Sequence, residues 1–248
     1  MPKNAILTWL HRYAARERVL GNDRCDDWAG KAVVELAPHS LLDVGCGDGS
    51  FLFRYLSKVP NEFYGVEGSP PRKLKAAKRG INVLNYDLNA RWPFETHRFD
   101  VVFASQVIEH LHNTRLFIEE MYRVLKPGGT AIVTSENLCS LLNCIALVLG
   151  YTPFSLMQVC GRYLGNPLGL HYQEPIDEPL PNDDPAFAGV SGHVRVLALR
   201  QARELFEQSG FTVELHSISI LPLPDILSRS LERFVSNRGH YLLIRARK

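Results

Sequence analysis

Short apolar runs alternate with amphipathic stretches through the middle of the chain, between residues 41 and 135. Apolar runs that end at a glycine or an acid indicate buried strands, whereas apolar residues at helical spacing indicate helices. The clearest helical spacing runs from 114 to 125, and the Lys-Pro-Gly-Gly sequence at 126–129 ends it. This alternation predicts an α/β fold with a parallel, doubly wound sheet. The predicted strands are 41–44, 63–66, 81–84, 99–104 and 130–134.

Further elements are predicted on both sides of this core. Residues 4–20 have the apolar spacing of an amphipathic helix, and Asp26 or Asp27 is placed to cap a second helix over 28–36. From residue 193 onward the pattern predicts two helices and two strands that extend one edge of the sheet. These elements are the helices 199–209 and 226–234 and the strands 211–220 and 240–247.

Residues 137–192 interrupt this rhythm. An apolar stretch at 138–149 is followed by an irregular, proline-rich segment, and residues 173–184 include acids but no Lys or Arg. Long loops inside compact domains are commonly functional lids. We therefore expect a single domain over 1–248, with N-terminal helices at 1–38 and a lid-like insertion at 137–192 after the fifth strand.

Composition narrows the class of function. The chain of 248 residues has 28 basic and 26 acidic residues and a formal charge of +2, so it lacks the electrostatic footprint of a nucleic-acid-binding protein. Its five cysteines form no Cys-x-x-Cys pair, which argues against a disulfide framework or a zinc knuckle. The sequence shows no signal-peptide pattern and no apolar run of the ~18 residues that a membrane span needs. These features predict a cytoplasmic protein in a reducing compartment.

A glycine turn follows the first predicted strand. Asp43 ends the strand, and glycines stand at 45, 47 and 49 before a helical pattern begins. Glycine permits positive φ and close approach of a ligand to the backbone, so the turn predicts a pocket for a small polar ligand. Because the carboxyl ends of parallel strands share one edge of the sheet, polar residues at those ends are expected on one rim. The residues at predicted strand ends are Asp43, Glu67, Asp87 and Ser105.

The spacing Asp-x-Gly-x-Gly-x-Gly at 43–49 resembles motif I of the class I S-adenosylmethionine (SAM) dependent methyltransferases. The Leu-Lys-Pro-Gly-Gly sequence at 125–129 and the Gly-His-x-Arg sequence at 192–195 are similar to the same family. Within it, residues 79–89 resemble the MetW-type proteins of methionine biosynthesis. The resemblance implies SAM as cofactor and a Rossmann-like, seven-stranded sheet whose last strand is antiparallel.

The resemblance also implies which residues bind the cofactor. Asp43 would orient the ammonium group of SAM, Glu67 would hold the ribose, and Asp87 would contact the adenine. Carried over by position, the cofactor-binding residues are Asp43, Gly45, Cys46, Gly47, Glu67, Gly68, Asp87, Leu88, Ser105 and Gln106.

The sequence Gln-Val-Ile-Glu-His at 106–110 resembles the Glu-x-x-Glu-His metal motif of some small-RNA 2′-O-methyltransferases and ubiquinone O-methyltransferases. Gln106 replaces the first acid and is a neutral, weaker ligand for hard cations. We therefore predict no metal ligands and no metal requirement. A carboxylate acceptor needs no base, whereas a hydroxyl does. His110 is the predicted catalytic base, with His171 and His193 as alternatives.

These observations predict methyl transfer from SAM to a small-molecule or lipid-like acceptor, at oxygen, and not to nucleic acid. The apolar stretch 138–149 would form one wall of the acceptor pocket. Its alternatives are a buried packing helix and a helix in weak contact with a membrane interface. Two other functions remain. One is an NAD-dependent oxidoreductase, because the sequence Gly-x-Gly-x-x-Ser at 45–50 approximates the fingerprint of that class. The other is a non-catalytic SAM-binding module that regulates a partner. The sequence specifies neither the acceptor nor the oligomeric state.

Overall fold

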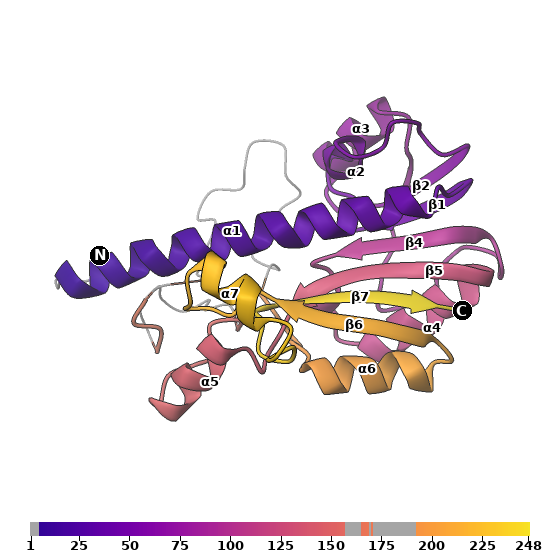
Figure 1. The fold of residues 1–248 in the computed structure, drawn as a ribbon. Coiled ribbons are helices and arrows are strands. Elements are labelled where there is room, and N and C mark those ends of the chain that lie inside the picture. Colours follow the sequence, from indigo (N-terminus) through magenta and orange to yellow (C-terminus); the bar gives the residue numbers. More distant parts are fainter. Residues whose placement is uncertain (1–4, 157–164, 169, 171–191) are drawn as a thin grey trace.

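A seven-stranded sheet forms the centre of the molecule (Figure 1). The computed structural model describes residues 5–156, 165–168, 170 and 192–248. The strands are β1 (Ser40–Val44), β2 (Glu62–Val66), β3 (Asn82–Leu84), β4 (Phe99–Ser105), β5 (Leu125–Glu136), β6 (Thr212–Ile218) and β7 (Tyr241–Arg247). Their order across the sheet is β3-β2-β1-β4-β5-β7-β6.

Strand β7 runs antiparallel to both of its neighbours, β5 and β6, while β1 to β5 pair in parallel. The predicted seven-stranded, doubly wound sheet with an antiparallel last strand is therefore confirmed. The strand order reverses between β1 and β4, and ligands of such sheets bind at the carboxyl ends of strands beside this point. That edge of the sheet is where the sequence placed the polar rim.

Helices cover both faces of the sheet, which explains why the inner strands are apolar without alternation. In β1, for example, Leu42 packs on the face that α4 and α6 cover, and the adjacent Leu41 packs on the face that α1, α2 and α3 cover. The helices are α1 (Ala5–Glu35), α2 (Ser50–Phe53), α3 (Pro70–Lys78), the 3-10 helix η1 (Ile108–His110), α4 (Thr114–Val124), α5 (Leu141–Val148), α6 (Leu199–Gln208) and α7 (Asp225–Leu231).

The prediction of two N-terminal helices was wrong, because α1 is one continuous helix from Ala5 to Glu35. Contacts with the end of the chain hold its middle. A side chain at Gly21 would lie 2.3 Å from the Ser219 hydroxyl, so glycine lets α1 pack closely there. Arg24 forms ion pairs with Asp225 at 2.9 Å and with Glu232 at 2.6 Å. These contacts override the weak helix propensity of glycine and the local capping signals.

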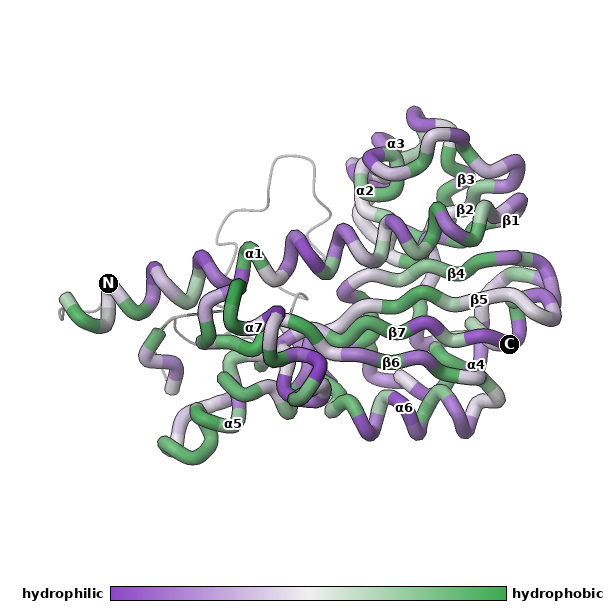
Figure 2. Tube along the Cα trace, viewed as in Figure 1, coloured by the Kyte–Doolittle hydropathy of each residue, from purple (hydrophilic) through white to green (hydrophobic). Residues whose placement is uncertain are grey.

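Helix α5 starts shortly after β5 and is anchored by polar side chains. Asn143 is fully buried, donates to the Asn137 carbonyl oxygen and the Ser155 hydroxyl, and accepts from the Ser155 amide. On the outer side of α5, Val148 is 86% exposed, and Figure 2 shows hydrophobic residues along much of this helix. The remainder of the predicted lid, at 157–164, 169 and 171–191, lies outside the described residues, so the lid stays a prediction.

No helix in the described part of the chain combines the length and the apolar character needed to cross a bilayer. The cytoplasmic location stays a prediction.

Candidate active site

A cavity of about 560 Å³ lies at the carboxyl ends of β1, β2 and β3. Five of the predicted cofactor-binding residues line it, namely Gly45, Glu67, Gly68, Asp87 and Leu88, together with the predicted base His110. The other lining residues were not predicted from the sequence; they are Val66, Ser69, Arg72, Asn85, Tyr86, Asn89 and Leu111. Most of these follow β2 or β3 directly, so the predicted strand ends were the signal that could have revealed them.

The glycine turn is shaped by positive φ angles of 76° at Gly45, 57° at Gly47 and 78° at Gly49. A side chain at Gly45 would meet Val107, and one at Gly49 would meet Ile81. At Gly47, in contrast, no described atom lies within 4 Å of where a side chain would begin. Gly47 therefore leaves open space beside the backbone, as close approach of a ligand requires.

Asp43 ends up almost fully buried, with 2% of its surface exposed. Burial, with a smaller contribution from the charge of Glu67, raises the pKa of Asp43 to about 8. A positively charged ligand group would stabilise the ionised form of this carboxylate. The site thus fits SAM, whose amino-acid part carries an ammonium group that Asp43 would hold.

Glu67 and Asp87 are both held by backbone amides. The Ser69 amide donates to Glu67 Oε1 at 2.7 Å, and the Asn89 amide donates to Asp87 Oδ1 at 2.9 Å. The carboxamide oxygen of Asn89 accepts in turn from the amides of His112 and Asn113. These bonds connect the acid predicted to contact adenine with the segment that follows His110.

Comparison with known proteins supports a single family. A family described as "Methyltransferase domain" matches residues 42–133. The bifunctional methionine biosynthesis protein MetXA/MetW of Rhodopirellula baltica is 33% identical over 118 residues, which cover 43% of this chain and 18% of that protein. The mitochondrial ubiquinone biosynthesis O-methyltransferase of Rattus norvegicus is 30% identical over 123 residues, which cover 46% of this chain and 35% of that protein. Residues 42–133 therefore carry the methyltransferase domain of this family. Each of the two relatives is matched over less than half of its own length.

A solved structure agrees on the fold. The SAM-dependent methyltransferase of Thermotoga maritima, described as a possible histamine N-methyltransferase, is 19% identical and superposes with a TM-score of 0.57, covering 97% of this chain and 91% of that one. The predicted family and fold are therefore confirmed, as are the predictions of a methyltransferase and of SAM as its cofactor.

Five predicted cofactor contacts lie outside the residues that line the cavity, namely Asp43, Cys46, Gly47, Ser105 and Gln106. Cys46 packs in the core beside Gly65. Ser105 hydrogen-bonds the Thr134 hydroxyl at 2.8 Å, and Gln106 donates to that hydroxyl at 3.3 Å. Cys46 therefore has a packing role of its own, while contact of Ser105 and Gln106 with SAM stays a prediction.

The end of η1 brings two acids and two histidines together. Glu109 is fully buried, and its burial and the charge of Glu136 raise its pKa to about 8. The His110 and His193 rings lie 4.9 Å apart, centroid to centroid. Burial, with the neighbouring His193, lowers the pKa of His110. The third candidate base, His171, lies outside the described residues.

Glu67→Ala is expected to weaken SAM binding by roughly 1–3 kcal/mol, the loss typical of hydrogen bonds to a charged group. The reason is that Glu67 lines the cavity where the ribose of SAM is predicted to lie. Calorimetric titration with SAM measures the change. Glu62→Ala, at the opposite end of β2, is the matched control and should bind SAM like the wild type. Equal affinity of a folded Glu67→Ala protein and the control would remove Glu67 from the site.

Proposed function

We propose that this protein transfers a methyl group from SAM to an oxygen atom of a small or lipid-like acceptor. The observation that carries the proposal is a second cavity, of about 570 Å³, whose lining is almost entirely apolar. It lies between α1 and α5, and α5 follows β5 closely in the chain. The residues around it include Trp9, Tyr13, Leu142, Ala146, Phe154 and Leu168. Cavities of this size and character take apolar small molecules.

The position of the second cavity supports this assignment. Helices α5 and α7 lie at the end of the molecule toward which β4 and β5 run (Figure 1). The cofactor cavity lies at the carboxyl ends of β1, β2 and β3, on the same edge of the sheet. An acceptor with its apolar body in the second cavity would reach the cofactor by extending its polar end along this edge. A relative named for O-methylation in ubiquinone biosynthesis supports oxygen as the accepting atom.

The chemistry asks little of the protein beyond orientation. SAM supplies an activated methyl group on its sulfonium. Asp43 and Glu67 would hold the cofactor so that its methyl points toward the acceptor, because correct alignment removes much of the barrier to transfer. An acceptor hydroxyl must also lose its proton, and His110, on the cofactor cavity wall, is the predicted base.

A membrane-interface contact is the second feature that we propose for this end of the molecule. Three successive residues at the end of α5 expose apolar side chains, with Leu147 57%, Val148 86% and Leu149 65% exposed. Trp9 of α1, which lines the same cavity, is 62% exposed. Apolar residues of this kind bind the boundary between headgroups and acyl chains, from which a lipid acceptor would be drawn.

Incubation with labelled SAM tests the acceptor class. With RNA, DNA and a lipid extract offered in separate reactions, label should enter an organic-soluble product. Label in either nucleic acid would refute the proposal, as would transfer confined to water-soluble molecules without an apolar body.

A pair of variants connects that activity to the apolar cavity. Ala146→Trp places a large side chain inside the cavity and should strongly reduce labelling of the lipid product. Ala77→Trp, on the exposed side of α3 and outside the lining of both cavities, should label it like the wild type. SAM affinity should be unchanged in both variants, and equal labelling by both would show that the acceptor lies elsewhere.

A further inference from the structure

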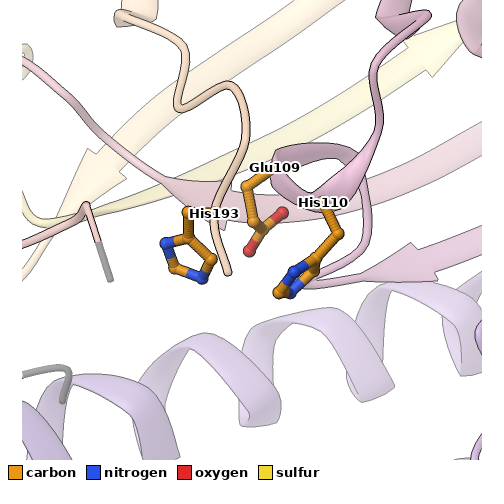
Figure 3. A group of neighbouring side chains, drawn as sticks. All are labelled: Glu109, His110 and His193. Carbon is orange, nitrogen blue, oxygen red and sulfur yellow. The ribbon is translucent and has the colours of Figure 1, made fainter. Parts of the chain in front are cut away.

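Three side chains that can each offer a lone pair converge beside the cofactor cavity, with no described hydrogen-bond donor between them (Figure 3). They are Glu109, His110 and His193, and one ligand atom from each lies within 4.8 Å of the other two. Figure 3 shows the three side chains pointing toward one another, with the carboxylate of Glu109 between the two imidazoles. Such a group needs a cation or a hydrogen-bond donor at its centre.

The tautomers of both histidines follow from their other contacts. His110 Nδ1 lies 3.3 Å from the Gly192 carbonyl oxygen, and His193 Nδ1 contacts the Ser155 carbonyl oxygen. A carbonyl oxygen only accepts, so each Nδ1 carries the hydrogen and each Nε2 keeps a lone pair. The nearby Glu136 carboxylate, 3.8 Å from His193 Nδ1, favours the same tautomer.

Glu109 completes the group with an oxygen that the protein leaves unpaired. Its Oε2 accepts from the Ser135 hydroxyl at 3.0 Å, whereas its Oε1 is buried and has no hydrogen-bond partner among the described residues. Buried polar atoms are normally satisfied, and an exception points to an absent ion or water. Metal-binding histidines in proteins are held in the same way, by a second hydrogen bond from the nitrogen that does not bind the metal.

We propose that Glu109, His110 and His193 bind a divalent first-row transition-metal ion. Two imidazoles and one carboxylate favour ions such as Zn²⁺, Fe²⁺ or Co²⁺ over Mg²⁺ and Ca²⁺, which prefer oxygen ligands alone. Donors around such an ion lie about 3–3.5 Å apart, so small side-chain rotations would close the group. The sequence predicted no metal because Gln106 replaces an acid. The structure instead supplies His193 from the far side of the insertion.

The consequence for catalysis rests on the proposed function, but the binding itself does not. His110 lines both the ion site and the cofactor cavity. An ion there is placed to bind the acceptor hydroxyl and lower its pKa, so that the proton is lost to water. His110 would then act as a metal ligand and not as a free base.

Metal uptake by the chain of 248 residues tests the proposal in the absence of SAM and acceptor. After removal of metals with a chelator, titration with Zn²⁺ should show one ion per chain, and Co²⁺ should give the visible absorption of a nitrogen- and oxygen-coordinated ion. His193→Ala should lose this site. Ser135→Ala, which keeps all three ligands, should bind roughly 10–100-fold more weakly, as loss of a second-shell hydrogen bond does.

His112→Ala is the matched control, because His112 is exposed and lies two residues beyond His110. It should bind the ion like the wild type. Thermal unfolding establishes that each variant is folded. The proposal is overturned if the wild type retains no ion, which would leave a proton shared between Glu109 and a histidine, or if folded His193→Ala and Ser135→Ala bind as tightly as His112→Ala.

Discussion

Asp43→Asn is expected to weaken SAM binding about 10–150-fold and to stabilise the ligand-free protein. The loss of affinity corresponds to a charge-assisted hydrogen bond of about 1.5–3 kcal/mol. The gain in stability arises because burial makes the ionised carboxylate unfavourable, as its pKa of about 8 indicates. Each kcal/mol gained should raise the unfolding temperature by roughly 2–4 °C in a chain of this size. Calorimetric titration and thermal unfolding measure the two effects.

The same residue should make SAM binding depend on pH. Because the pKa of Asp43 in the ligand-free protein is about 8, binding of a cationic ligand must release a proton at lower pH. SAM affinity should therefore rise from pH 6 to pH 8, by up to about tenfold per pH unit. Asp43→Asn should remove this dependence, and a wild-type affinity that is flat over that range would contradict the role of Asp43.

Asp43 should make stability fall as the pH rises, whereas it makes SAM affinity rise. Its pKa is raised on folding, so its contribution to the stability of the ligand-free protein is fully present below its unfolded value and is lost as the pH rises through about 8. Saturating SAM should reduce this loss. The buried Asp43 therefore destabilises the ligand-free protein but favours binding of a charged cofactor, a combination that is common at functional sites.

The helices and strands were predictable where the local pattern of apolar residues was enough to determine them. Apolar runs such as Leu41–Val44 fixed the strands because both faces of the sheet are covered. The continuity of α1 from Ala5 to Glu35 was not predictable in this way. Asp26 and Asp27 look like helix caps in sequence, but the contact of Gly21 with Ser219 and the ion pair of Arg24 with Glu232 come from the other end of the chain. Such long-range contacts carry no local signal.

Some residues of the site were likewise predictable from local sequence, and others were not. The rim residues Glu67 and Asp87 were predictable because carboxyl ends of parallel strands converge. The meeting of Glu109 with His193 was not, since the insertion separates them in sequence. Their proximity depends on backbone hydrogen bonds from the Val194 and Arg195 amides to the Glu109 carbonyl oxygen.

Gly47→Ala is expected to abolish most SAM binding while leaving the fold intact. The open space at Gly47 means that a methyl group there meets no described atom of the protein, but it would occupy space predicted to lie against the amino-acid part of SAM. Filling a well-packed contact typically costs 1–3 kcal/mol, or about 5–150-fold in affinity. The positive φ of 57° adds a stability cost of roughly 1–2 kcal/mol.

Gly80→Ala separates these two effects. Gly80 also has a positive φ, of 90°, and no described atom within 4 Å of an added side chain, but it lies between α3 and β3, outside the glycine turn that is predicted to contact SAM. Both variants should therefore lose a similar amount of stability, measured by thermal unfolding, because each places a side chain in the left-handed region. Only Gly47→Ala should lose affinity for SAM in calorimetric titration. Equal affinities would mean that the turn shapes the backbone without contacting the cofactor, and the open space at Gly47 would then need another occupant.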